Sequence, residues 1–163
     1  MDMSYRIGLG FDVHQLNPDR RLILGGVDIP HDLGLEGHSD ADVLTHAVMD
    51  SLLGALAMGD IGDHFPDTDS KFRGADSLFL LRQVWAMIEK EGYVIINLDN
   101  VLIAQKPRLK PFLNEMRENL ANCIGCKMKQ VSVKATTTEK LGYAGREEGI
   151  AAKSIVLLHK TNP

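Results

Sequence analysis

The chain has 163 residues, 44% of them hydrophobic and 25% charged, which predicts one globular domain spanning residues 1–163. A net charge of −4 excludes bulk attraction to nucleic acid or an anionic membrane, so an anionic ligand needs local neutralisation by a metal ion or a few basic side chains. No apolar run reaches the roughly 18 residues of a membrane span, and the N-terminus lacks the features of a secretory signal. We therefore expect a cytoplasmic protein with no nucleic-acid or membrane partner.

The first predicted element is a strand, because apolar residues alternate with other residues from Ile7 to His14. The odd positions are apolar, as expected for a half-buried strand. The even positions place Asp12 and His14 on the opposite face, together with Gly8 and Gly10. A hairpin should follow the strand, with Gly25-Gly26 as its turn.

A helix is predicted after the glycine-rich loop 30–37. Ser39 and Asp42 have the spacing of a capping box, in which Ser39 would be the N-cap and Asp42 would take the place of the usual Glu three residues later. Apolar residues from Val43 to Leu56 then recur with a helical period. Asp42 and His46 are four residues apart and share a face other than this apolar stripe. We therefore expect His46 to point away from the core, toward a polar partner.

The remaining elements follow from the same patterns. The first helix is expected to end near Gly59, and residues 59–69 are too polar for a strand or a helix. Asp76 or Ser77 should cap a second helix that ends before Gly92. Further segments are predicted as a strand (93–104), a helix (111–124), a strand (130–135), a polar loop or short helix (136–149) and a closing strand (150–159). The fold class is α+β (mixed α/β): one domain with a roughly four-stranded mixed sheet, a small hairpin, and helices on one face.

Cys123 and Cys126 form a C-x-x-C motif, which in other proteins serves as a redox pair or as half of a zinc site. The sequence holds 2 cysteines in total, so no second pair completes a zinc site. No strand leads into a helix at this point, as a thioredoxin-like motif requires. The simpler interpretation, a buried cysteine at a helix end, is preferred.

Asp12, His14 and His46 together predict a metal site, with a fourth position left for substrate as in catalytic zinc centres. Taken singly, each of them has the simpler interpretation of a solvated polar residue. The segment 136–139 follows a strand and could hold phosphate oxygens and a Mg²⁺ ion on Glu139, or could be a plain hydroxyl-capped turn. The basic loop 106–110 could form a phosphate or base pocket, but a solvated charge run is the default interpretation.

Five segments of the sequence identify a family. They are GFDVH, ILGGVDIP, GHSDADVLTHAVMDSLLGALAMGDIGDHFPDTD, VLIAQKPRLKP and KATTTEKLGYAGREEGIA. In these residues and in their order, the chain closely resembles the 2-C-methyl-D-erythritol 2,4-cyclodiphosphate synthase family over nearly its whole length. The resemblance implies a lyase of the non-mevalonate isoprenoid pathway. The reaction it implies converts 4-diphosphocytidyl-2-C-methyl-D-erythritol 2-phosphate into the cyclic diphosphate and CMP.

The resemblance also implies roles for individual residues. It places Zn²⁺ or another divalent cation on Asp12, His14 and His46, and makes Glu139 the ligand of a second ion, Mg²⁺ or Mn²⁺, that bridges the substrate diphosphate. It makes His38 and Thr137 the catalytic residues, as stabilisers of the transition state. The implied substrate contacts are Asp12, Val13, His14, His38, Ser39, Asp60, Ile61, Gly62, Phe65, Pro66, Asp67, Thr68, Asp69, Ala104, Gln105, Lys106, Pro107, Arg108, Leu109, Lys110, Thr136, Thr137, Thr138, Glu139, Tyr143 and Arg146.

Two positions depart from the family pattern. Arg108 stands where relatives often carry Lys, and Tyr143 stands where Phe is common. Family resemblance further implies a homotrimer whose active sites are shared between neighbouring subunits. Two other functions remain as alternatives: a metal-dependent phosphohydrolase, because Asp/His/His sites also activate water, and a non-catalytic sensor of CDP-linked or isoprenoid diphosphates.

Overall fold

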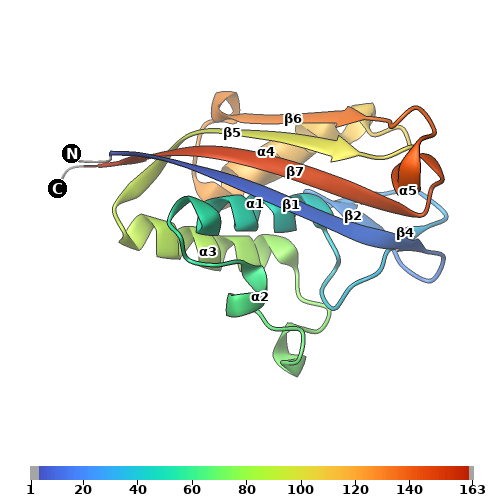
Figure 1. The fold of residues 1–163 in the computed structure, drawn as a ribbon, viewed down its shortest axis with the longest axis horizontal. Helices are drawn as coiled ribbons and strands as arrows, with labels where there is room; N and C mark the ends of the chain where they lie inside the picture. Colours follow the sequence, from blue (N-terminus) through green and yellow to red (C-terminus); the bar gives the residue numbers. More distant parts are fainter. Residues whose placement is uncertain (1–3, 162–163) are drawn as a thin grey trace.

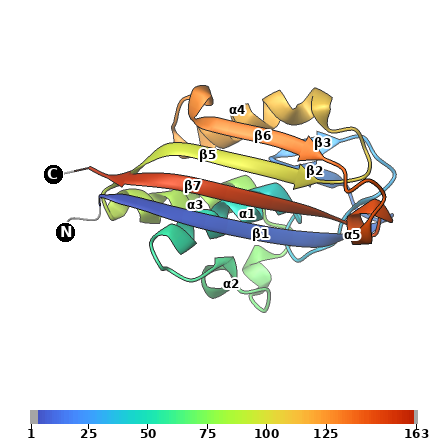
Figure 2. The same cartoon turned by 45° about the horizontal axis from the view of Figure 1, so that its top comes forward.

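A five-stranded mixed sheet with the strand order β4-β1-β7-β5-β6 forms one layer of the molecule, and helices α1, α3 and α4 cover one of its faces (Figures 1 and 2). The computed structural model describes residues 4–161. The four long strands confirm the predicted sheet, and the two-residue β4 extends its edge. The strands are β1 (Tyr5–Asn17), β4 (Gly34–Leu35), β5 (Tyr93–Ile103), β6 (Val131–Thr136) and β7 (Gly149–Lys160).

Strand directions decide which loops meet. Strand β7 is antiparallel to both β1 and β5, and β5 is parallel to β6. The C-terminal ends of β1, β5 and β6 therefore lie at the same end of the sheet, where α5 also sits (Figure 1). The predicted site residues Asp12 and His14 near the end of β1, and the predicted segments 104–110 after β5 and 136–139 at the end of β6, therefore lie toward this end of the sheet.

The helices are α1 (Val43–Ala55), α2 (Ile61–His64), α3 (Ser77–Lys90), α4 (Leu113–Ile124) and α5 (Gly142–Gly145), with 3₁₀ turns at η1 (Ser70–Phe72), η2 (Lys110–Phe112) and η3 (Met128–Gln130). The predicted hairpin is confirmed as β2 (Leu22–Leu24) and β3 (Val27–Ile29). Its two turn glycines both have positive φ, 57° and 71°, which only glycine adopts at low cost. Within residues 4–161, none of the helices has the length and apolar character needed to cross a membrane.

A half-buried strand usually covers its apolar face, but in β1 the apolar face is the exposed one. Ile7 and Leu9 are 72% and 65% exposed, and it is the glycine face that packs against α1. A Cβ on Gly8 would lie 1.8 Å from the Ser51 carbonyl oxygen, and a Cβ on Gly10 would lie 1.9 Å from the Ala47 carbonyl oxygen. The two glycines therefore allow strand and helix backbones to approach more closely than any side chain would permit.

Helix α1 is buried on nearly all sides, and His46 is only 6% exposed, so the expectation that it points away from the core is wrong. The expectation that it faces a polar partner is confirmed, because Nδ1 lies 2.9 Å from Asp12. The capping box at Ser39 is also absent. Asp42 is the N-cap, and its carboxylate accepts from the backbone N–H of Thr45 and from the backbone N–H groups of Gly25 and Gly26 in the hairpin turn. Asp42 thus connects the hairpin to the start of α1.

Several predicted boundaries move by a few residues. Helix α1 ends at Ala55, and Ala57 rather than Gly59 takes the first positive φ after it. The segment predicted to have no regular structure contains α2, because Asp60 caps it through a capping box with Asp63. Helix α3 begins after its N-cap Asp76, as predicted.

Candidate active site

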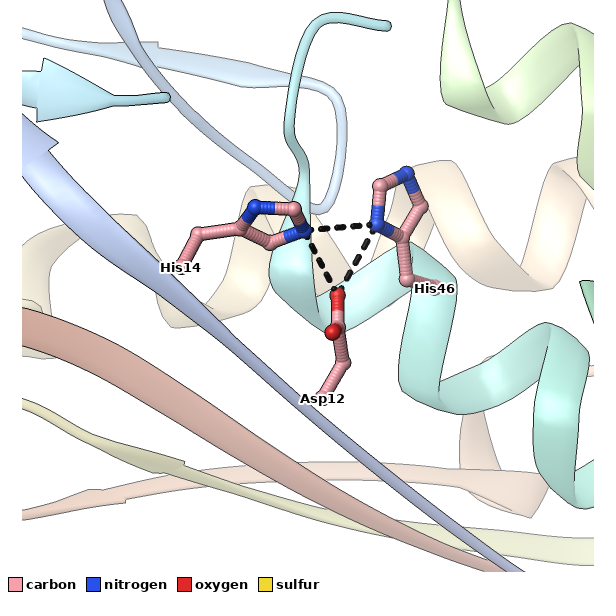
Figure 3. Close-up of side chains that lie close together, drawn as sticks. All are labelled: Asp12, His14 and His46. Atoms are coloured by element: carbon pink, nitrogen blue, oxygen red, sulfur yellow. Dashed lines mark hydrogen bonds and ion pairs between the residues drawn. The ribbon is translucent and has the colours of Figure 1, made fainter. Parts of the chain in front are cut away.

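Asp12, His14 and His46 converge on one point at the end of β1 (Figure 3). Oδ2 of Asp12 lies 2.9 Å from Nε2 of His14 and 2.9 Å from Nδ1 of His46, and the two ring nitrogens are 3.2 Å apart. Three ligands of a tetrahedral ion with bonds of 2.0–2.1 Å stand about 3.3 Å from one another. The cluster therefore has the donor types and nearly the spacing of a three-ligand metal site.

Hydrogen bonding explains why the lone pair of His14 faces this point. Nδ1 of His14 lies 2.7 Å from the backbone oxygen of Glu36, which can only accept a hydrogen bond. The N–H of His14 is therefore on Nδ1, and Nε2 presents its lone pair to Asp12 and His46. Two ring nitrogens and a carboxylate that face one another at these distances repel unless a proton or a metal cation lies among them, so the donor set suits a divalent ion.

The electrostatics agree with this reading. Burial raises the pKa of Asp12, but hydrogen bonds and positive charge from His14 and His46 outweigh burial and hold that pKa well below its usual range. Burial lowers the pKa of His14, but the hydrogen bond and charge of Asp12 outweigh it and raise the pKa. Both shifts have one cause: positive charge is stabilised between these side chains.

The cluster lies in the wall of a cavity of about 560 Å³. Its volume is in the range of a small-molecule site. Residues of four separate segments surround it, and several had been predicted as substrate contacts. The predicted residues that line it are Asp12, His14, His38, Ser39, His46, Ile61, Gly62, Phe65, Pro66, Asp67 and Thr68; those not foreseen are Gly37, Met49, Phe72 and Leu80.

The predicted side chains of Asp60 and Asp69, beside this cavity, accept hydrogen bonds from backbone N–H groups. Oδ1 of Asp60 accepts from the Gly62 N–H at 2.9 Å as the cap of α2. Asp69 caps η1, and its carbonyl oxygen lies 3.2 Å from Nε2 of His38. Phe65 to Thr68 line the cavity, and the contact of residues 65–69 with substrate, which the family resemblance implies, stays a prediction.

A second group of predicted residues assembles at the ends of β5 and β6, outside this cavity. The Ala104 N–H donates to the Thr136 oxygen at 3.0 Å, and the Lys140 N–H donates to Oε1 of Gln105 at 3.2 Å. Lys106 pairs with Glu147 at 3.0 Å. The predicted members of this group are Ala104, Gln105, Lys106, Pro107, Arg108, Leu109, Lys110, Thr136, Thr137, Thr138 and Glu139.

Within this group the side chains differ in their exposure to solvent. Ala104 and Leu109 are 6% and 3% exposed, so any ligand would meet their backbone only. Glu139 is exposed, has a positive φ of 52°, and accepts from the Thr137 hydroxyl at 3.3 Å. Glu139 is not part of the Asp12 cluster. Within one chain, the predicted substrate contacts therefore fall into two separate groups, one around the cavity and one at the ends of β5 and β6.

The last two predicted contacts lie near α5. Tyr143 lines a separate cavity of about 520 Å³, together with Val13, His14 and Glu148. Arg146 forms a bidentate ion pair with Glu148, with N–O distances of 2.9 and 3.0 Å. Exposed ion pairs of this kind contribute little to stability, so Arg146 can exchange Glu148 for an anionic ligand at low cost.

The C-x-x-C motif has the simpler of its two interpretations. Cys123 is buried at the end of α4, where its thiol donates to the Leu78 oxygen at 3.1 Å, and Gly125 ends the helix in the left-handed region. Burial raises the pKa of Cys123 to about 11 and also raises the pKa of Cys126. Both thiols are free, and neither is poised as a nucleophile.

We therefore expect Cys123 to resist iodoacetamide in the native protein at about pH 8, where only about one thiol in a thousand would be ionised with that pKa. Mass spectrometry after timed quenching measures the modification of each cysteine. The same reagent on the guanidinium-unfolded chain is the control and should label both residues. Rapid labelling of native Cys123 would contradict its assignment as a structural residue.

Comparison with known proteins agrees with the geometry. The model of the YgbB family matches residues 5–159. A 2-C-methyl-D-erythritol 2,4-cyclodiphosphate synthase from Geobacillus sp. (strain WCH70) is 60% identical over 156 residues, which cover 96% of this chain and 99% of that protein. The synthase of the same name from Clostridioides difficile (strain 630) is 55% identical over 157 residues, 96% of this chain and 98% of that protein.

Solved structures share the fold. IspF of Plasmodium falciparum in a CDP complex superposes with a TM-score of 0.87 at 34% identity, covering 99% of this chain and 100% of that one. The bifunctional IspDF of Campylobacter jejuni gives a TM-score of 0.93 at 45% identity over 97% of this chain, which spans only 43% of that longer protein. The match of the family model over nearly all of the chain, together with these relatives, shows that the chain belongs to the YgbB family.

Proposed function

We propose that this chain converts 4-diphosphocytidyl-2-C-methyl-D-erythritol 2-phosphate into 2-C-methyl-D-erythritol 2,4-cyclodiphosphate and CMP. The observation that carries the proposal is the Asp12–His14–His46 cluster in the wall of a cavity, in a chain whose relatives are named for this activity. The chain is accordingly an enzyme, a phosphorus–oxygen lyase of isoprenoid precursor biosynthesis. Its substrate is a small CDP-linked molecule.

The reaction needs little acid–base chemistry from the protein. An oxygen of the substrate's 2-phosphate attacks the β-phosphorus, the bond from that phosphorus to the bridging oxygen breaks, and CMP leaves with that oxygen. The attacking oxygen is already ionised at neutral pH, so no strong general base is required. The tasks left to the protein are therefore positioning of the substrate and neutralisation of its charge.

Charge repulsion is the main obstacle. Two phosphate groups about 4 Å apart repel by several kcal/mol, and the protein must fold the substrate so that its ends meet. We assign Asp12, His14 and His46 to Zn²⁺ or another divalent cation. The ion would supply Lewis-acid neutralisation of the β-phosphate. The chain's own contribution is to fix the three ligands on a strand and a buried helix.

The other residues hold the substrate and exclude water. We assign His38 and Ser39 to the 2-phosphate and erythritol, because both line the cavity beside the cluster. The Ile61–Gly62 turn and the segment 65–69 would close over the erythritol and ribose. His38 and Thr137 are proposed to stabilise the transition state by hydrogen bonds. Residues 104–110, helped by residues 135–137, are proposed to bind the cytosine.

We propose that a trimer with shared active sites brings the cavity of one subunit together with the residues at the ends of β5 and β6 of its neighbour. The outer sheet face supports this proposal, since Ile7, Leu9, Phe11, Val13 and Ile155 are 72%, 65%, 47%, 43% and 51% exposed. An apolar face of this kind usually marks a protein interface. Sedimentation equilibrium should then give about 54 kDa, three times the 18.0 kDa chain, and a mass of 18 kDa would contradict the proposal.

Glu139 is proposed as the protein ligand of Mg²⁺ or Mn²⁺ across the α- and β-phosphates, because Mg²⁺ is commonly held by one or two carboxylates together with substrate phosphates. Glu139→Gln should raise the Mg²⁺ concentration needed for half-maximal turnover about tenfold or more and leave Zn²⁺ bound at the other site. A Mg²⁺ titration at saturating substrate measures the shift. Glu118→Gln, which changes an exposed carboxylate on α4, is the matched control. A curve identical to the parent would remove Glu139 as the ligand.

The decisive assay offers the cytidyl substrate and follows CMP and the cyclic product by mass spectrometry. In ¹⁸O-labelled water the cyclase incorporates no solvent oxygen, because the nucleophile belongs to the substrate. A metal-dependent phosphohydrolase would place ¹⁸O in a phosphate product. A sensor would bind the substrate without releasing CMP, and either result would overturn the proposed function.

A further inference from the structure

The far side of the His46 ring is occupied by two buried hydroxyl groups. Nε2 of His46 lies 3.1 Å from Oγ of Ser77 and 3.1 Å from Oγ of Ser39, while Nδ1 faces Asp12. Ser77 is fully buried and Ser39 is 9% exposed. Nothing in the sequence pattern marks Ser77 for this task, because a serine at that position is equally explained as a helix cap. The contact exists only because the start of α3 packs against α1.

Ser77 can only accept a hydrogen bond from His46, because its own proton is already used. Its hydroxyl forms a very close hydrogen bond with Oδ1 of Asp40, and its backbone N–H donates to Oδ2 of the same carboxylate at 3.0 Å. An ionised carboxylate only accepts, so the single hydroxyl proton of Ser77 goes to Asp40. Oγ of Ser77 must then accept from His46. The proton of a neutral His46 ring therefore sits on Nε2, and Nδ1 keeps its lone pair.

We propose that Asp40 and Ser77 are positioning residues of the metal centre, forming a carboxylate–hydroxyl–imidazole chain that selects the tautomer of His46 and aims Nδ1 at the cation. The inference rests on the proposed metal centre and adds two residues that do not touch the ion. It parallels the Glu36 oxygen behind His14, so both histidines have a fixed acceptor on the side away from the cluster. Acceptors placed in this way orient ligand rings and strengthen their donation to a metal.

The position of Asp40 makes this arrangement rigid. Its N–H donates to the Ala75 oxygen at 3.1 Å, and its carboxylate also accepts from the Asp42 N–H at 3.2 Å. The loop before α1 and the loop before α3 are thereby joined directly behind His46. Rotation of the ring would leave the buried Ser77 oxygen without its donor, which costs about 1–3 kcal/mol.

Zinc affinity tests the proposal without any turnover. The metal-free full-length protein is titrated with Zn²⁺ against a chelator of known affinity. Ser77→Ala and Asp40→Asn should each weaken Zn²⁺ binding about 10- to 100-fold. Ser77→Thr keeps the hydroxyl and should recover most of the affinity. Ser51→Ala removes another fully buried serine, whose hydroxyl donates to the Val48 oxygen at 2.8 Å, and should leave the affinity unchanged. Affinities for Ser77→Ala and Asp40→Asn within twofold of the parent would overturn the proposal.

A second experiment uses the unsubstituted protein, so its result does not depend on whether a variant folds. Long-range ¹H–¹⁵N spectra of the metal-free chain at about pH 8, where an ordinary histidine is neutral, report which nitrogen of His46 carries the proton. A proton on Nε2 supports the proposal, and a proton on Nδ1 overturns it. Neither experiment uses the cytidyl substrate, so absence of CMP formation would count against the proposed function and leave this assignment intact.

Discussion

Asp12→Ala, His14→Ala and His46→Ala should each abolish turnover and strip the protein of zinc. The three donor atoms stand 2.9–3.2 Å apart, so removing any one leaves two ligands and an incomplete site. A catalytic metal supplies several kcal/mol of transition-state stabilisation, and each 1.36 kcal/mol is a factor of ten. We expect a loss of about 10³-fold or more in kcat/KM, with zinc content measured in parallel by plasma mass spectrometry.

His159→Ala is the matched control. His159 pairs with Tyr5 on β1, whereas Asp12 pairs with Ala152, so the two histidine sites are about 24 Å apart along the sheet. Its removal should change neither zinc content nor kcat/KM by more than about twofold. Asp12→Asn adds a variant of nearly the same shape that lacks the negative charge. Full zinc occupancy in all three alanine variants would refute the ligand assignment, whatever happened to turnover.

Gly10→Ala should destabilise the fold by about 3 kcal/mol or more, or prevent folding. The added Cβ would lie 1.9 Å from the Ala47 carbonyl oxygen and 2.8 Å from the Ser51 nitrogen, and both are backbone atoms of α1. A rigid helix cannot move one atom aside, so the whole helix must shift away from β1. The shift would also carry His46 away from Asp12, so the remaining folded protein should bind zinc poorly.

Urea unfolding followed by the fluorescence of Trp85, the single tryptophan and 7% exposed, measures the loss. Gly54→Ala is the control on the same helix, because its Cβ would meet only the Leu9 oxygen at 3.9 Å. Alanine is the better helix former by up to about 1 kcal/mol, so Gly54→Ala should be neutral or stabilising. If Gly10→Ala unfolded at the same urea concentration as Gly54→Ala, the close approach of β1 and α1 would not limit stability.

The sequence determined much of this protein because several of its signals are local. The Gly25-Gly26 turn predicts the hairpin through backbone conformation alone, and Gly125 ends α4 for the same reason. Asp12 and His14 share a face because side chains alternate along a strand, wherever that strand lies. The residue types then predicted His46 as their partner, 32 residues after His14 and 34 residues after Asp12.

The tertiary structure decided which face of each element is inside. The alternation of residues in β1 does not indicate which face of the strand is covered. The glycine face is the covered one because it lets α1 approach closely, and Ile7 and Leu9 remain exposed on the outer face of the sheet. Burial of α1 on nearly all sides depends on β1, β7 and α3 packing around it, so His46 is inside although its local pattern suggests otherwise. The contacts of Ser77 and Glu36 behind the two histidines arise between segments distant in sequence, and hydrogen bonds of that kind leave no periodic trace that a pattern in one chain could reveal.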